Sequence, residues 1–90
     1  MNFEWDDRKR LSNLGKHRID FVDAVDVFDG RPRFDFASPR RGEHRMVSIG
    51  ELDGIIVAVV WTRRDPDTVR IISVRRARRE EKKPYREIHG

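Results

Sequence analysis

The sequence predicts an α+β fold with two N-terminal helices, a four-stranded antiparallel sheet and a C-terminal helix. Three observations support this fold class. Apolar residues recur at helical spacing before residue 30, the pattern becomes strand-like from Arg33 onward, and turn-forming residues then follow at short intervals. Ninety residues are enough for one domain, and no linker or internal repeat divides them, so we expect a single domain over residues 1–90.

The first helix is expected to begin at Asp6 or Asp7 and to run to about His17. An aspartate side chain suits this start because it accepts hydrogen bonds from the free N–H groups of a first helical turn. The apolar stripe of the helix is thin, and Leu11 and Leu14 are the residues expected on its buried side.

The second helix has a more complete apolar face. Asp20 is a suitable N-cap, and Asp29 followed by Gly30 marks the end. Between them, apolar residues occupy positions i, i+3, i+4 and i+7, namely Phe21, Ala24, Val25 and Phe28. We expect this face to pack on the sheet.

Four strands are expected after the second helix, joined by hairpins and therefore antiparallel. They span residues 33–37, 45–50, 55–63 and 69–75, separated by turns at 38–42, 52–54 and 65–67. The third strand, IIVAVVWT, is apolar on both faces. It is therefore expected at the centre of the sheet, covered on one side by the first two helices and partly on the other by the chain that follows.

The fourth strand is expected to alternate regularly. One face would carry Val69, Ile71, Ser73 and Arg75, and the other Arg70, Ile72 and Val74. Basic side chains would then project from both faces of the sheet near this strand.

The string RRARREEKK after the fourth strand favours a helix. Glu80 and Glu81 are placed to pair with basic residues one turn away. Pro84 is expected to end or kink this helix near Lys83, because proline removes one helical hydrogen bond and crowds the preceding turn.

Charge is distributed unevenly along the chain. The net charge is +4, yet eight of the seventeen residues from Arg70 to Arg86 are Lys or Arg, while residues 1–30 carry more acids than bases. A cluster this dense repels itself and attracts phosphate groups. The charge pattern therefore indicates a polyanionic partner, with nucleic acid as the first candidate.

Composition disfavours several other classes of function. Cysteine is absent, so the protein uses no disulfide, catalytic thiol or thiolate metal ligand. Acidic residues do not gather at ligand spacing, and we expect neither a metal nor a cofactor. The longest apolar run, residues 55–61, is too short to cross a bilayer, and no signal peptide is evident. We therefore expect a cytoplasmic protein without membrane contact.

Three stretches of the sequence resemble one protein family. The opening reads FEWDDRKRLSNLGKHRIDFVDAVDVF, the third strand ends in Trp61, Thr62 and Arg63, and the fourth continues as RIISVRRARREE before Tyr85. In this order, over essentially the whole length, they are similar to the BrnT family of bacterial toxins. Arg18 stands where family members commonly have Gly, and Pro84 interrupts a stretch that they fill with helix formers.

The resemblance implies a ribonuclease of RelE-like fold that acts as the toxin of a type II toxin-antitoxin system. Such a toxin inhibits translation and growth and is neutralised by its cognate antitoxin. In this family the antitoxin is typically a ribbon-helix-helix protein, here BrnA-like. It represses the shared operon, so the toxin would contact operator DNA only through the antitoxin.

RNA cleavage without a metal needs a base for the ribose 2'-hydroxyl, a cation for the transition state and an acid for the leaving 5'-oxygen. His17 is the best candidate base, since Lys9, Asn13 and Lys16 are expected to share a polar helix side with it, although this side also reads as an ordinary solvated helix end. His89 is expected in a frayed terminus without a role. The catalytic candidates are His17, Lys16, Arg70, Arg76 and Glu80.

The candidates for RNA binding lie where the third and fourth strands meet the last helix. They are Arg63, Arg75, Arg79, Trp61 and Tyr85. Arginine suits phosphate because its planar guanidinium donates two parallel hydrogen bonds. Trp61 and Tyr85 offer rings for base stacking, but both also suit the core. The arginines equally suit an acidic surface of an antitoxin.

The alternative function is a non-catalytic basic module that binds nucleic acid or a protein. It accounts for the charge but gives Lys16 and His17 no role. Incubation with RNA in EDTA separates the two hypotheses, because only the enzyme yields products.

Overall fold

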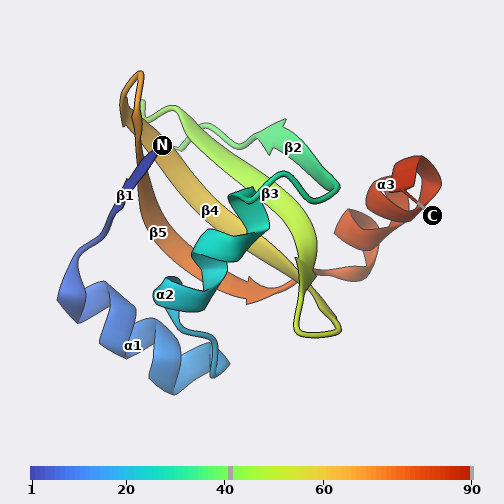
Figure 1. Cartoon of the computed structure of the whole chain (residues 1–90), viewed down its shortest axis with the longest axis horizontal. Helices are drawn as coiled ribbons and strands as arrows, with labels where there is room; N and C mark the ends of the chain where they lie inside the picture. The colour runs from blue at the N-terminus through green and yellow to red at the C-terminus, as the bar shows by residue number, and fades with distance from the viewer. Residues whose placement is uncertain (41, 90) are drawn as a thin grey trace.

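The computed structural model describes residues 1–40 and 42–89, and its centre is a five-stranded sheet with the order β1-β5-β4-β3-β2 (Figure 1). In chain order the elements are β1 (Asn2–Glu4), α1 (Asp7–His17), α2 (Phe21–Ala24), the 3-10 helix η1 (Val25–Phe28), β2 (Arg33–Ala37), β3 (Arg45–Leu52), β4 (Ile55–Asp65), β5 (Thr68–Arg76) and α3 (Arg79–His89). The predicted α+β class and the four predicted strands are confirmed. In the part of the chain that is described, no helix is long and apolar enough to span a membrane.

The prediction of a purely antiparallel four-stranded sheet is wrong, because a fifth strand joins it. Strand β1 pairs in parallel with the start of β5, with Phe3 opposite Val69. The sheet is therefore mixed. A three-residue strand is too short to show the two-residue period that marks strands in a sequence.

Helix α1 has the predicted bounds but not the predicted buried face. The side chain of Asp6 accepts hydrogen bonds from the backbone of the first turn, and Arg18 ends the helix in the left-handed region, with φ 58°. Arg18 therefore adopts the conformation that glycine adopts most easily. The expectation that Leu11 and Leu14 face the core is wrong, since they are 63% and 37% exposed. The buried residue of α1 is Asn13.

The second helical segment changes its winding halfway. Asp20 caps α2 as predicted, and Phe21 and Ala24 are buried. From Val25 the chain continues as a 3-10 helix, which tightens the turn and directs Val27 fully into the core. Val27 meets the sheet at Gly50, where any Cβ atom would lie 2.9 Å from a Val27 methyl group.

Strand β4 is the central strand, as predicted, and both its faces are covered. On one face Val57, Val59 and Trp61 pack against α2 and η1. On the other face Ala58 packs with Tyr85 of α3. Figure 1 accordingly shows α1 and α2 apart from α3, which follows the end of β5.

The regular alternation predicted for β5 is wrong because the strand contains a bulge. Trp61 of β4 is opposite Ile71, whereas its neighbour Val60 is opposite Ser73, so Ile72 is an extra residue. The bulge moves Val74, instead of Ser73, into the core with Val69 and Ile71. Arg75 consequently points toward α3.

Helix α3 passes through Pro84 and continues to His89. Of the two expected outcomes near Lys83, a stop or a kink, the stop is therefore wrong. Pro84 is the sixth of the eleven residues of α3, so the helix tolerates in its middle the one hydrogen bond that proline cannot donate. Two contacts, one before and one after Pro84, hold the helix in place. Glu81 accepts a hydrogen bond from the Arg78 N–H at the helix start (2.7 Å), and Tyr85 is buried against the sheet.

Candidate functional site

The arginines of this protein fall into two sets according to whether an acid neutralises them. Ion pairs join Arg10 to Asp20, Arg31 to Asp29, Arg33 to Asp35, Arg45 to Glu43, Arg64 and Arg70 to Glu4, and Arg75 to Glu81. A guanidinium that is already paired with a carboxylate gains less from a phosphate than one that is not. The unpaired set is therefore the better place to look for a polyanion site.

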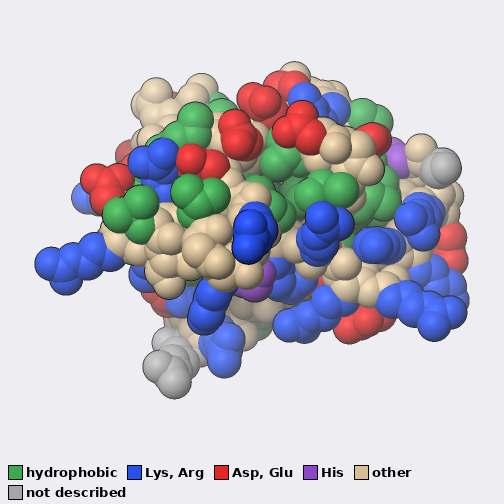
Figure 2. Space-filling model, turned by 90° about the horizontal axis from the view of Figure 1, so that it is seen from below, with side chains coloured by type: hydrophobic (Ala, Val, Ile, Leu, Met, Phe, Trp, Pro, Cys, Tyr) green, Lys and Arg blue, Asp and Glu red, His purple; other side chains and the backbone are tan. Residues whose placement is uncertain are grey.

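Unpaired arginines such as Arg8, Arg18, Arg40 and Arg63 lie elsewhere among the described residues, but the densest group of unpaired cations lies at the end of β5 and along α3. We call it the α3 basic set; its members are Arg76, Arg78, Arg79, Lys82, Lys83 and Arg86, and none of them forms an ion pair within residues 1–40 and 42–89. In Figure 2 Lys and Arg side chains follow one another across the lower and right-hand part of the surface, while acidic side chains lie mainly along the upper part. The basic side predicted from the sequence is thus present.

One groove, the α3 groove, brings part of this set together with titratable side chains. It lies between α3 and the β3–β4 turn, and its lining includes Arg76, Lys82, Tyr85, Arg86 and His89. The cations are drawn from two elements, since Arg76 ends β5 and the others lie on α3. The groove therefore combines positive charge with groups able to exchange protons.

His89, which was expected to have no role, lines the α3 groove, as do Lys82 and Arg86, which were not among the predicted site residues. Its Nε2 atom lies 3.0 Å from the carbonyl oxygen of Arg33, and its ring packs beside that of Tyr85. A carbonyl oxygen can only accept, so Nε2 donates this hydrogen bond. The expected frayed terminus is thus held to β2. The signal was available, since Tyr85 and Ile88 continue an apolar pattern beyond Pro84.

A second groove, the α1 groove, contains Lys16 and His17. It lies between α1 and β5, with Lys9 and Ser12 from the helix and Ser73 from the strand also in its lining. Lys16 and His17 are exposed in the last turn of α1, where the helix dipole favours positive charge. All four residues of the predicted polar side, Lys9, Asn13, Lys16 and His17, line this groove.

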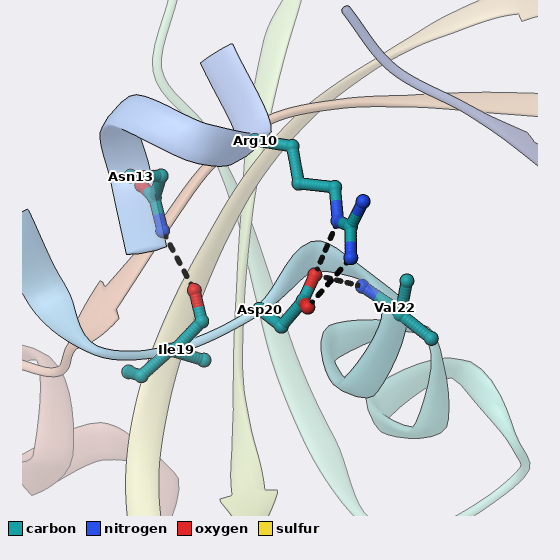
Figure 3. A network of polar contacts seen from close by, with 5 residues as sticks. All are labelled: Arg10, Asn13, Ile19, Asp20 and Val22. Carbon is teal, nitrogen blue, oxygen red and sulfur yellow. Dashed lines mark hydrogen bonds and ion pairs between the residues drawn. The ribbon is translucent and has the colours of Figure 1, made fainter. Parts of the chain in front are cut away.

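Asn13 belongs to the same side of α1 but is buried, and its side chain holds the structure together. It accepts hydrogen bonds from the Val74 N–H (3.1 Å) and the Ser73 hydroxyl (3.2 Å), and it donates to the carbonyl oxygens of Val74 and Ile19. Figure 3 shows the bond to Ile19, next to the Arg10–Asp20 pair. Asn13 therefore fixes α1, and the α1 groove with it, to β5.

Arg70 lies outside both grooves. Its guanidinium is 2.6 Å from the carboxylate of Glu4, which Arg64 also contacts at 2.9 Å. The hydrogen bond from Arg70 lowers the pKa of Glu4, and Arg64 adds to this effect. Arg70 therefore stabilises the junction of β1 and β5, at a distance along β5 from Arg76.

Arg75 is similarly engaged. It forms two hydrogen bonds with Glu81, at 2.7 and 3.0 Å, in a pair that is largely shielded from solvent. Burial alone would raise the pKa of Glu81, but the hydrogen bonds from Arg75 and from the Arg78 N–H outweigh it and hold the pKa below its ordinary value. The pair connects the end of β5 to the first turn of α3.

The two aromatic candidates for base stacking are core residues. Trp61 is 4% exposed and donates its indole N–H to the Ser48 hydroxyl at 2.8 Å, while Tyr85 is 9% exposed. Their burial favours the core role, which the sequence also allowed for both, over stacking on bases. Arg63 lies over the Trp61 ring, 5.3 Å from its centroid, and donates to the Pro66 carbonyl oxygen.

The predicted site residues therefore do not form one cavity. Arg76 and Tyr85 share the α3 groove, Lys16 and His17 share the α1 groove, and Glu80 and Arg79 lie on the exposed surface of α3. The end of β5 joins the two grooves, since α1 packs along β5 and α3 follows it (Figure 1). Among the described residues no group of three or more His, Asp or Glu side chains is arranged to hold a metal ion.

Comparison with known proteins agrees with this architecture. Residues 5–81 match the family model described as the ribonuclease toxin BrnT of type II toxin-antitoxin systems. The crystal structure of the Brucella abortus ribonuclease toxin BrnT superposes with a TM-score of 0.71 at 33% identity, and the match covers 88% of this chain and 99% of that one. A search of curated protein sequences found no match. The chain belongs to the BrnT family of ribonuclease toxins of type II toxin-antitoxin systems.

Proposed function

We propose that this ribonuclease cleaves RNA without a metal ion, by attack of a ribose 2'-hydroxyl on the adjacent phosphate, with the RNA lying across the end of β5. The observation that carries the proposal is the division of the cations. Acids neutralise Arg70 and Arg75, whereas the α3 basic set, including Arg76 and Arg79, forms no ion pair with any described residue. Unpaired cations are free to neutralise phosphates.

The reaction requires two proton transfers, one from the attacking 2'-hydroxyl and one to the leaving 5'-oxygen. His17 takes the proton from the 2'-hydroxyl, the 2'-oxygen bonds to phosphorus, and the bond from phosphorus to the 5'-oxygen breaks. Arg76 stabilises the negative charge of the transition state, which a permanently charged guanidinium suits. Lys16 and Glu80 are the two candidates for the acid that protonates the leaving oxygen. The products are a 2',3'-cyclic phosphate and a 5'-hydroxyl.

The roles of the remaining arginines follow from their partners. Arg79 and the other cations of α3 bind the RNA backbone, and Arg63 adds a contact at the far end of β4. Arg70 and Arg75 mainly position β1 and α3, and contribute to RNA binding less than the unpaired cations do. The arginines assigned mainly to RNA binding or catalysis are therefore fewer than those predicted from the sequence.

The biological role follows from the reaction. Cleavage of cellular RNA inhibits translation and growth until a cognate antitoxin binds the toxin. We further propose that this antitoxin is a BrnA-like ribbon-helix-helix protein, through which alone the toxin contacts operator DNA. Its gene is expected beside that of the toxin.

The test is cleavage of end-labelled RNA by the purified protein in excess EDTA. We expect products with a 2',3'-cyclic phosphate terminus, and a His17→Gln variant that is folded but at least about 100-fold slower, the usual range for loss of a general base. Salt-sensitive RNA binding without any products would contradict the proposal. So would cleavage that EDTA abolishes and added Mg²⁺ restores.

A further inference from the structure

A groove between β2 and α3 contains aromatic rings that are only partly buried. Phe34 and Phe36 line it from the strand, Pro84 lines it from the helix, and Arg78 lines it directly before the helix. We call it the β2–α3 groove; its volume is about 390 Å³, within the range of pockets that hold small ligands. It shares no lining residue with the α3 groove, so it is a separate feature of the surface.

Phe34 and Phe36 form one aromatic surface on β2. Residues two positions apart in a strand point to the same face, and the two ring centroids lie 6.1 Å apart. Their partners on β3, Ile49 and Val47, are buried in the core beneath α3. Strand β2 is the last in the order of the described strands, so no further described strand shields the rings from that side.

The helical wall of the groove is held in place by contacts on both sides of Pro84. Before it, Glu81 forms two hydrogen bonds with Arg75, at 2.7 and 3.0 Å. After it, Nε2 of His89 donates to the carbonyl oxygen of Arg33 on β2, at 3.0 Å. The pyrrolidine ring of Pro84 is itself rigid. The groove is therefore already formed, which lowers the entropic cost of binding a ligand.

The charge around the groove remains positive after the acids are counted. Residues 76–87 contain six Lys or Arg and three Glu. Of the three acids, Glu81 is paired with Arg75, while Glu80 and Glu87 are exposed. Cations therefore outnumber acids along this side of the molecule, and the surplus attracts phosphates.

The cation in the lining of the groove is Arg78, which forms no ion pair within residues 1–40 and 42–89. Other charged residues near the groove neutralise one another. Arg33 and Asp35 form an ion pair, and they alternate with the two phenylalanines, so they point to the opposite face of the sheet. Arg45, at the start of β3, is paired with Glu43. Arg78 is thus the groove cation that is free to bind a phosphate.

We propose that the β2–α3 groove holds one unpaired RNA base, which stacks on Phe34 and Phe36 against Pro84, while Arg78 binds a neighbouring phosphate. Proteins commonly hold single-stranded nucleic acid by placing aromatic rings beside cations. Slots between aromatic and apolar side chains also hold bases that are turned out of a stack. The surplus of cations favours this occupant over a protein segment. The proposal rests on the proposed function, because it places part of the RNA substrate.

The position of the groove extends the path of the RNA. Helix α3 begins after the end of β5, where Arg76 lies, and it packs on β2 and β3 (Figure 1). An RNA strand that follows the cations of α3 away from the end of β5 therefore reaches the β2–α3 groove. A base must be unpaired to enter the groove, so the RNA is single-stranded at this point and the base lies outside the cleaved bond.

The test measures binding of a short, fluorescently labelled, single-stranded 2'-O-methyl RNA, which lacks the attacking hydroxyl and stays intact. Phe36→Leu keeps an apolar side chain but removes one ring. Phe28→Leu is the matched control, because it makes the same change at a partly buried phenylalanine on the opposite face of the sheet. We expect Phe36→Leu to bind at least about 5-fold more weakly, the lower end of the loss for one stacked ring. Phe28→Leu should bind as the wild type does, and Phe36→Tyr, which retains the ring, should bind nearly as well.

Salt dependence separates stacking from charge. Stacking releases no counterions, so Phe36→Leu should leave the slope of log affinity against log salt concentration unchanged. Arg78→Gln should reduce this slope by about one phosphate contact.

Two further measurements do not depend on the folding of a phenylalanine variant. Pro84→Ala removes one wall of the groove while it restores a helical N–H, so it folds, and we expect it to bind RNA at least about 2-fold more weakly. Replacing the RNA bases one at a time by abasic residues should weaken binding to the wild type at one position. That position should make no difference to Phe36→Leu.

The possible outcomes distinguish the stacking site from the proposed function. Wild-type affinity in both Phe36→Leu and Pro84→Ala, or an equal loss in Phe28→Leu, would overturn the stacking site alone. So would a Phe36→Leu variant that loses affinity for the purified antitoxin but not for RNA, because the groove would then hold a protein. A wild-type toxin that neither binds nor cleaves RNA would overturn the proposed function and the stacking site together.

Discussion

Asn13 pairs with Val74 in the way that a neighbouring strand would. Its side-chain amide donates to the Val74 carbonyl oxygen at 2.9 Å and accepts from the Val74 N–H at 3.1 Å. Strand β1 covers this edge of β5 only from Thr68 to Arg70, and none of the described strands lies beside the edge beyond it. A single side chain from α1 thus satisfies the backbone at the point where the edge strand has ended.

Replacing Asn13 by Ala is expected to lower the free energy of unfolding by about 2–4 kcal/mol, because it leaves several buried backbone groups without partners. Leu11→Ala, on the same helix but exposed, should change it by less than about 0.5 kcal/mol. Urea unfolding followed by circular dichroism measures both. Equal effects of the two substitutions would contradict the account of α1 packing.

Gly50→Ala should destabilise the protein by about 1–3 kcal/mol, the usual range for overpacking a core. The new methyl group would lie 2.9 Å from Val27, on the 3-10 helix. Val27→Ala alone leaves a cavity, but in the double variant the two changes should partly compensate. A double-mutant cycle in urea tests this. Strictly additive effects would show that the two residues do not press on each other.

The Arg10–Asp20 pair predicts a specific dependence of stability on pH. The hydrogen bond from Arg10 and that from the Val22 N–H lower the pKa of Asp20 to about 2. The unfolded value is about 3.9, so the stabilisation is fully present above about pH 4 and is lost as pH falls toward 2. Asp20→Asn keeps a good N-cap but removes the charge.

Unfolding free energies of the wild type and Asp20→Asn, measured from pH 7 to pH 2, separate the effect of the Asp20 charge from the effect of its N-cap. The two curves should run parallel above pH 5 and converge below pH 4, where the wild-type carboxylate gains its proton. Asp20→Ala should be less stable than Asp20→Asn throughout, because it also loses the cap. A difference between wild type and Asp20→Asn that stays constant down to pH 2 would refute the assignment.

Glu81 and Glu80 are adjacent, yet we expect very different effects from their replacement. Glu81→Gln weakens the hydrogen bonds to Arg75 and to the Arg78 N–H and should cost about 1–2 kcal/mol of stability. Glu80 is exposed, and Glu80→Gln should cost less than about 0.5 kcal/mol. Thermal unfolding compares them. A stable Glu81→Gln protein with wild-type α3 packing would show that the pair does not anchor this helix.

The sequence predicted most of the fold because the signals for it are local. The aspartate caps indicated where α1 and α2 begin, and a run of residues that is apolar on both faces indicated that β4 is the central strand. The errors have a common physical origin in contacts between distant residues. Asn13 is buried only because an edge of β5 lies beside it, and Ile72 bulges only because of the pairing of β5 with β4.

The positive charge of the candidate site could be predicted from the sequence, but the spatial arrangement of its residues could not. The density of Lys and Arg after Arg75 indicated a polyanion surface from the sequence. Which arginines are neutralised depends on pairs such as Glu4 with Arg70, which are 66 residues apart, and no local pattern reveals them. His89 was set aside because it was expected in a frayed terminus, and its contact with Arg33, far away in the sequence, is not visible in a local pattern.

The measurement that tests the central claim most directly compares RNA cleavage by two arginine variants in EDTA. Arg76→Gln removes an unpaired cation at the end of β5, and Arg45→Gln removes an arginine that is already paired with Glu43. With both variants folded, we expect Arg76→Gln to cleave at least about 100-fold more slowly, as for loss of one transition-state contact, and Arg45→Gln to cleave at the wild-type rate. Equal rates for Arg76→Gln and the wild type would contradict the account.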